Sequence, residues 1–228
     1  MSKSAAAKVF SSREEAGRAL ASLLVSFAGR EDVVLVAIPR GGVPVATEIS
    51  ARLSLPLQVL VAERIQAPYH DAWQQRLSIG AVAPGGVQVL DTARISELGI
   101  PTSDAELALK CSRMEQTTKE TLYAGTLPTI PMCGRTVILI DDAIETGSTV
   151  RAAMQALQAQ EPARVYVAAL AVHEPAYRTL STLATQVYCL ARPPAGVAPH
   201  TFLSEFPPLT DEDAIAILGS HRDRKIAE

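Results

Sequence analysis

The sequence predicts an α/β protein with a Rossmann-like, mostly parallel sheet flanked by helices. Three continuous apolar runs, at 33–38, 136–140 and 165–172, are rich in β-branched residues, as strands buried on both faces usually are. A stretch of helical period follows each run. Strands that alternate with helices indicate right-handed crossovers, and the ligands of such sheets bind beyond the carboxyl ends of the strands.

The first part of the chain predicts a helix and then a β-α-β unit. Ser12 and Glu15 have the spacing of a capping box, and apolar residues recur behind them at helical period. The apolar run at 33–38 leads into a second helix with Pro44 in its first turn, where a missing N–H costs nothing. Residues 57–62 are the next predicted strand.

The middle of the chain predicts a long loop, a hairpin and a long helix. Residues 63–78 are polar and without period, and loops of such length are often functional. Two short apolar runs at 79–82 and 87–90 flank a Pro-Gly-Gly turn, which is typical of a hairpin. A helix is expected to begin near residue 103, and Cys111 on it is expected to be a small buried hydrophobe. The apolar positions of that helix are Leu107, Cys111 and Met114.

The last part continues the alternation of strands and helices. The strongest strand, 136–140, is followed by a helix that includes Val150, and the apolar run at 165–172 is a further strand. The remaining predicted elements are a helix at 175–184, a strand at 186–190 and a helix at 211–218.

Composition excludes several classes of protein. The 228 residues carry 21 basic and 24 acidic side chains, which gives no electrostatic footprint for nucleic acid or an anionic membrane. No apolar stretch approaches the roughly 20 residues that span a bilayer. The three cysteines are far apart and odd in number, which excludes a disulfide framework and favours a reducing compartment. We therefore expect a cytoplasmic protein without nucleic-acid or membrane partners.

The segment 136–149 carries the chemistry. A buried strand delivers Asp141 and Asp142 to its carboxyl end, and a turn with Gly147 and several hydroxyls leads into a helix. Turn amides and a helix N-terminus bind anions, whereas two carboxylates suit hydroxyl groups or a divalent cation. Each pattern is common alone as a solvated cap. Together on one strand-turn-helix they indicate a ligand with a diol and a phosphate, such as a sugar phosphate.

The segment 137–149 resembles the phosphoribosyl-diphosphate (PRPP) signature of the type I phosphoribosyltransferases. Residues 10–20, 38–46 and 78–82 and the tail from Phe206 are similar to a bacterial branch of that family, so the resemblance covers nearly the whole chain. It implies the type I phosphoribosyltransferase fold with a flexible lid and a small hood. The expected divisions are a core at 1–191, with the lid at about 63–78, and a hood or tail at 192–228.

The resemblance also implies roles for particular residues. Asp141 and Asp142 would bind the ribose hydroxyls and act in catalysis, and Arg64 would contact the diphosphate. The strand at 33–38 would be followed by the diphosphate loop, which consists of Arg40, Gly41 and Gly42. The residues expected around the 5′-phosphate are Ala143, Glu145, Thr146, Gly147, Ser148 and Thr149.

Position alone suggests one further contact. His173 ends the strand at 165–172, on the same sheet edge as Asp142, and could face the acceptor. A loop histidine with a satisfied ring is the more frequent case.

By resemblance, the reaction transfers a 5-phosphoribosyl group from PRPP to a small nitrogenous acceptor, such as a nucleobase, and releases diphosphate. The transition state has oxocarbenium character, and Mg²⁺ on the diphosphate, with Asp141 and Asp142 as candidate carboxylates, assists departure. A homodimer is also expected from the family.

A second function stays open, namely a sensor or regulator that binds PRPP or a nucleotide without catalysis. Glu63 and Glu145 place negative charge beside the expected anion sites and favour the sensor. The intact Asp-Asp and Arg-Gly-Gly sequences favour the enzyme.

Overall fold

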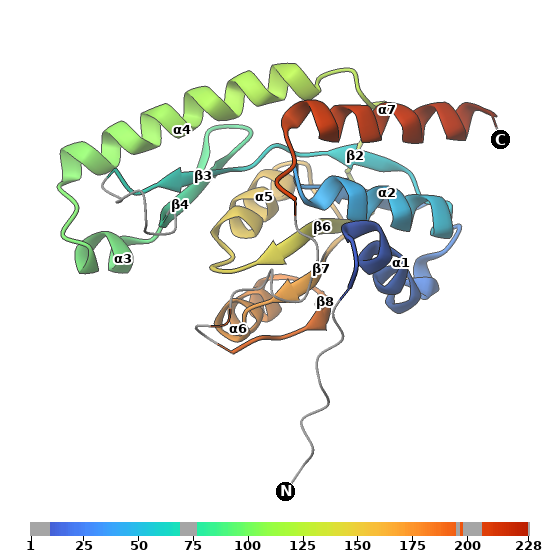
Figure 1. The fold of residues 1–228 in the computed structure, drawn as a ribbon, viewed down its shortest axis with the longest axis horizontal. Helices are drawn as coiled ribbons and strands as arrows, with labels where there is room; N and C mark the ends of the chain where they lie inside the picture. The colour runs from blue at the N-terminus through green and yellow to red at the C-terminus, as the bar shows by residue number, and fades with distance from the viewer. Residues whose placement is uncertain (1–9, 69–76, 195–196, 198–206, 228) are drawn as a thin grey trace, which may run out of the picture.

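The computed structural model of the protein describes residues 10–68, 77–194, 197 and 207–227. Its main sheet has five parallel strands in the order β2-β1-β6-β7-β8 (Figure 1). This sheet confirms the predicted α/β class and places the first strand beside the strand that carries the acidic pair. The strands are β1 (Val33–Ala37), β2 (Leu57–Val59), β6 (Thr136–Ile144), β7 (Arg164–Val172) and β8 (Gln186–Ala191).

Helices cover both faces of the main sheet. Alternate residues of one strand point to opposite faces, so Val34 is buried against α5 and α6 while Leu35 is buried against α1 and α2. The C-terminal helix α7 packs on the outside of α2 (Figure 1). The helices are α1 (Arg13–Leu23), η1 (Val25–Phe27), α2 (Gly42–Leu53), α5 (Ser148–Gln158), α6 (Glu174–Leu183) and α7 (Asp211–Ala227).

A second, smaller unit lies beside the main sheet. Three antiparallel strands in the order β3-β4-β5 pack against α4, and α5 of the main unit contacts β4 and β5. The hairpin of β4 and β5 confirms the prediction from the Pro-Gly-Gly turn. The elements are β3 (Glu63–Gln66), β4 (Ser78–Ala83), β5 (Val87–Leu90), α3 (Thr92–Glu97) and α4 (Thr102–Tyr123).

The prediction of a loop from residue 63 onward was wrong for its first residues. Residues 63–66 form β3, which pairs with β4 and buries Ile65 completely. β3 is an edge strand of the small sheet and pairs with another strand on one side only. Its sequence is polar, so no apolar run marks it as a strand. Residues 69–76 of the predicted lid lie outside the described residues, and the division at residue 191 stays a prediction.

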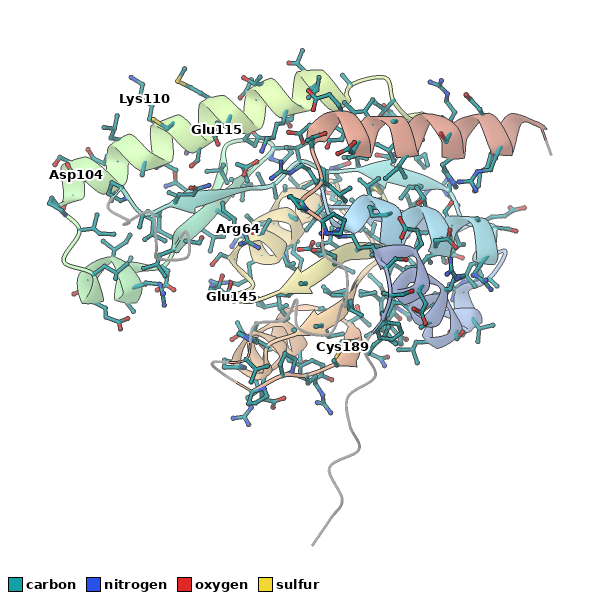
Figure 2. The ribbon with its side chains drawn as sticks, viewed as in Figure 1. Arg64, Asp104, Lys110, Glu115, Glu145 and Cys189 are labelled. Atoms are coloured by element: carbon teal, nitrogen blue, oxygen red, sulfur yellow. The ribbon has the colours of Figure 1, made fainter. Side chains whose placement is uncertain are left out.

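The long helix α4 exists, but its predicted buried face was wrong. Leu107 and Met114 are 61% and 64% exposed, and Cys111 is exposed as well. Figure 2 shows Lys110 on the outer side of the same helix, and Glu115 is exposed as well.

The buried residues of α4 are Ala105, Ser112, Gln116 and Tyr123, so two of the four are polar and uncharged. Ser112 donates to the Arg64 carbonyl (3.2 Å) and Gln116 donates to the Val61 carbonyl (3.2 Å). The helix therefore satisfies backbone acceptors at the edge of the small sheet, a role that polar side chains fill and apolar ones cannot.

Helix α1 begins where the capping box predicted. The Ser12 hydroxyl accepts from the Glu15 amide, but the Glu15 carboxylate reaches back to Ser11 rather than to Ser12.

In the part of the chain that is described, no helix is both long and apolar enough to cross a bilayer.

The docking of α7 depends on a buried histidine. His221 is 3% exposed and its Nε2 lies 3.1 Å from the Ser50 hydroxyl on α2, which itself donates to the Leu55 carbonyl. Burial, with Lys225 and Arg224 nearby, lowers the pKa of His221 to about 4.

The free energy of unfolding should therefore fall as His221 is driven to protonate. An unfolded histidine titrates near pH 6.5, so this contribution is complete above pH 6.5 and is lost as the pH falls toward about 4. In His221→Gln the amide can keep the bond to Ser50 without titrating. Denaturant melts at pH 7, 6, 5 and 4 should show a shallower decline for this variant, and parallel declines would contradict the role of His221.

Candidate functional site

The carboxyl ends of β1 and β6 meet because the two strands are neighbours in the parallel sheet. The Ile38 amide donates to the Ile140 carbonyl (2.9 Å), so the loop after β1 lies against the end of β6. A Cβ on Gly41 would lie 2.0 Å from Asp142 Oδ2, and one on Gly42 would lie 2.6 Å from the Ile140 oxygen. Close approach is thus what requires glycine at both positions.

Asp142 is held by a buried ion pair. Its Oδ2 accepts from Arg13 Nε (2.9 Å), and its Oδ1 accepts from the Ala143 amide (2.8 Å). The two side chains are only 7% and 13% exposed, and Arg13 also donates to the Pro207 carbonyl. Asp142 therefore joins the first helix, the β1–α2 loop and the start of the C-terminal segment.

Asp141 stands in a different environment. Its Oδ1 accepts from the Asp142 amide (2.8 Å), and the residue lies at a cavity wall. Burial, followed by the neighbouring Asp142 carboxylate, raises the pKa of Asp141 well above its usual range, and Arg64 opposes this rise. A hydroxyl or a cation brought to Asp141 would favour its ionised form.

The turn after β6 has the geometry of an anion site. Gly147 takes a φ of +78°, a left-handed conformation that favours glycine, and α5 begins at the next residue. The Thr146 hydroxyl accepts from the Ser148 amide (3.4 Å). The first amides of a helix have no acceptor within the helix, so those of α5 point toward whatever binds at the turn.

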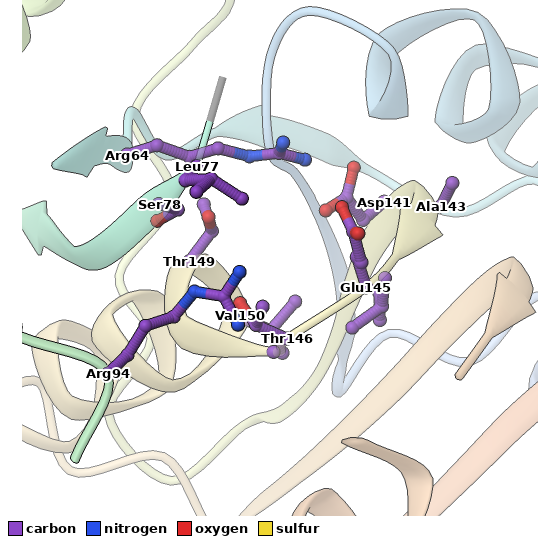
Figure 3. Close-up of a pocket in the computed structure, with 12 residues that line it drawn as sticks. Arg64, Leu77, Ser78, Arg94, Asp141, Ala143, Glu145, Thr146, Thr149 and Val150 are labelled. Atoms are coloured by element: carbon purple, nitrogen blue, oxygen red, sulfur yellow. The ribbon is translucent and has the colours of Figure 1, made fainter. Parts of the chain in front are cut away.

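Two adjoining cavities contain most of the predicted site. The first, of about 330 Å³, lies over the turn (Figure 3), and the second, of about 430 Å³, lies over the β1–α2 loop. Ala143, Glu145, Thr146 and Gly147 line the first, and Arg40, Gly41 and Asp142 line the second. The residues that line both are Arg64, Ser78, Asp141 and Thr149.

The three other predicted site residues do not line these cavities. The Ser148 side chain is buried beside Thr146, and Gly42 is buried at the start of α2. His173 is buried at the start of α6, where its Nε2 contacts the Val197 carbonyl oxygen.

Glu63 and Glu145 are the two acidic residues that the sequence places beside the expected anion sites. Glu63 forms an ion pair with Lys119 of α4, so its charge is already matched by a partner other than Arg64. Glu145 is exposed, and its place in the structure is at the wall of the first cavity, which Asp141 also lines. Within the described ranges, no group of three or more carboxylate, imidazole or thiol side chains is placed to hold a metal ion.

Sequence reasoning missed three cations at the site. Arg13 follows Ser12, where the capping pattern alone explained the local sequence, and Lys119 and Arg94 lie on helices far from the motif in sequence. Arg13 and Lys119 line the second cavity, and Arg94 lines the first. Arg13 lies within residues 10–20, which resemble the family, but no local pattern assigns any of the three cations to the site, because only the fold brings them to it.

Comparisons with known proteins find related sequences and structures. Residues 11–187 match a family model described as "Phosphoribosyl transferase domain". A Mycobacterium tuberculosis protein named "Putative phosphoribosyl transferase" is 32% identical over 219 residues, which are 95% of this chain and 48% of that protein. The chain thus spans about half the length of the curated relatives it matches.

Two further similarities cover different shares of the chain. The crystal structure of TT1426 from Thermus thermophilus has a TM-score of 0.72 and 31% identity, covering 93% of this chain and 98% of that one. The "Bifunctional protein PyrR" of Haemophilus ducreyi is 39% identical over 67 residues, which are 28% of this chain and 37% of that protein.

The adjacent carboxylates should respond oppositely to the same substitution. Asp141→Asn removes a charge that burial disfavours, so the Tm at pH 7 should rise by roughly 2–4 °C. Asp142→Asn breaks the buried ion pair with Arg13, and a loss of about 3 kcal/mol should lower the Tm by roughly 6–12 °C. Calorimetry on both variants measures these Tm shifts. Equal shifts of the same sign would contradict the inference that Asp141 and Asp142 stand in different environments.

The close approach at Gly41 predicts a second effect. Gly41→Ala should lower the free energy of unfolding by about 1–3 kcal/mol because the new methyl group displaces the Asp142 carboxylate. Gly219→Ala is the matched control, since a Cβ there meets nothing within 4 Å and helix α7 should gain stability. Urea titrations that give both variants wild-type midpoints would contradict the tight packing.

Proposed function

This chain belongs to the phosphoribosyltransferase family, and we propose that it transfers the 5-phosphoribosyl group of PRPP to a small nitrogenous acceptor with release of diphosphate. The observation that carries the proposal is the pair of adjoining cavities. Asp141, which lines both, lies between an anion-binding turn on one side and a loop with Arg40 on the other. PRPP has the matching order of groups, with a phosphate, a diol and a diphosphate.

In the proposed binding mode each charged end of PRPP has its own cavity. The 5′-phosphate is held by the amides and hydroxyls at Thr146, Gly147 and Thr149. The diphosphate lies over the β1–α2 loop, where Arg40 and Arg64 offset its charge. Fixing both ends orients C1 of the ribose and lowers the entropy cost of the displacement.

The bond between C1 and the diphosphate oxygen breaks while the acceptor nitrogen approaches the opposite face of the ribose. Positive charge develops on the ring, as in other oxocarbenium-like transition states. We assign Asp141 to the ribose hydroxyls, where its carboxylate also stabilises that charge. Asp142 has two partners within the protein, so we assign it the positioning of the β1–α2 loop as well as any contact with the diol.

Mg²⁺ fits this site as a companion of the substrate. No described group of three protein ligands is present, whereas diphosphate oxygens and the Asp141 carboxylate are the hard donors that Mg²⁺ prefers. When bound, the ion would neutralise part of the charge on the leaving group.

A sensor that binds PRPP without turnover is the second candidate. The observation that favours it is that two carboxylates, those of Asp141 and Glu145, line the first cavity. Repulsion between these carboxylates and an anionic ligand is compatible with binding that is regulated rather than catalytic.

Diphosphate release distinguishes the two candidates. Wild-type protein with PRPP, Mg²⁺ and a panel of nucleobases should release diphosphate, and Asp141→Asn should lower the rate by about 10²-fold or more, as expected for loss of an electrostatic contact in the transition state. Asp223→Asn, which changes an exposed carboxylate on α7, is the control and should keep the wild-type rate. PRPP binding without release for every acceptor would favour the sensor, and absence of PRPP binding would contradict both.

A further inference from the structure

Arg94 is a charged residue at the first cavity that the motif does not include. It belongs to α3 of the small unit, and its side chain extends across the cavity toward Thr146 (Figure 3). Its Nε is buried and, among the described residues, has no hydrogen-bond partner. The structure also gives the guanidinium no ion pair within the described part of the chain, although carboxylates line the same cavity.

A buried Arg94 donor without an acceptor destabilises the protein unless a ligand accepts its hydrogen bond. A guanidinium stays charged at any pH at which the protein folds, and a buried donor without an acceptor loses its hydration without compensation. Buried polar atoms in native proteins are nearly always satisfied, so an exception at a cavity wall is a donor available to a ligand in that cavity. A ligand that accepts several hydrogen bonds from a planar, forked donor is a phosphate or a carboxylate.

The position of Arg94 indicates which end of a bound sugar phosphate it would contact. Arg64 lies near Asp141, because its charge acts on that carboxyl group, and it lines both cavities. Arg94 lines the cavity over the turn and is absent from the wall of the cavity over the β1–α2 loop. The Arg94 guanidinium is therefore at the phosphate end of the site.

We propose that Arg94 completes the 5′-phosphate subsite, where it donates to a phosphate monoester that the turn holds from its other side. The proposal rests on the proposed function and extends it to a residue outside the signature. The turn supplies only amides and hydroxyls, so Arg94 adds the full positive charge that offsets a dianion and the nearby Glu145.

A phosphate at Arg94 would lie between the two units of the protein. The turn belongs to the main unit, and Arg94 belongs to the small unit built on β3, β4 and β5. A phosphate bound between them contacts both units at once. Arg94 also makes the site selective for phosphorylated sugars, since a free sugar offers the guanidinium no anion.

Calorimetric titration of wild-type protein, Arg94→Gln and Arg94→Lys with ribose 5-phosphate tests the assignment. Loss of a charge-assisted hydrogen bond should weaken binding of ribose 5-phosphate by Arg94→Gln about 10- to 100-fold. Arg94→Lys should recover part of the loss, because lysine keeps the charge without the fork. Binding of unphosphorylated ribose, at whatever level wild-type shows, should not change.

Arg113→Gln is the matched control, since Arg113 is on the same unit, bonds to Gln88 and lines neither cavity. The Tm of Arg94→Gln should equal or exceed that of wild-type, because the substitution removes an unsatisfied buried donor. Wild-type affinity in Arg94→Gln would overturn the role of Arg94 and leave the proposed function standing. If wild-type protein binds neither ribose 5-phosphate nor PRPP, the proposed function fails and this inference fails with it.

Discussion

The ion pair between Arg13 and Asp142 holds the parts of the site in their arrangement. β1 and β6 are adjacent, so the loop after β1 must pass the acidic end of β6 at backbone distance. The Asp142 carboxylate fills the space beside Gly41, and Arg13 neutralises it there. One buried charge thus fixes the loop, the first helix and, through Pro207, the beginning of the C-terminal segment.

The acidic residues near the cavities differ in whether a basic side chain of the protein already pairs with them. Asp142 is matched by Arg13, and Glu63 is matched by Lys119. Asp141 has a backbone amide as its hydrogen-bond donor, and its raised pKa reflects that its ionised form is not fully stabilised. Preorganised but unsatisfied groups of this kind are typical of binding sites, where the ligand supplies the missing interaction.

The site is shared between two units with different tasks. The main parallel sheet provides the turn, the acidic pair and the β1–α2 loop, all at strand ends that the topology brings to one edge. The small antiparallel unit provides cations, with Arg64 on β3, Arg94 on α3 and Lys119 on α4. The proposed ligand, which carries several negative charges, would contact both units at once.

The parallel sheet, its acidic strand end and the turn that follows could all be predicted from the sequence. Those features depend on local signals, namely β-branched apolar runs, the glycine at a left-handed position and the cap of α1. Three other features became visible only in the folded chain: residues 63–66 form a strand, α4 buries Ser112 and Gln116 rather than Cys111, and Arg13 and Arg94 reach the site. An edge strand, a polar helix face and a distant cation gain their stability from partners far along the chain, and no local pattern of residues records those partners.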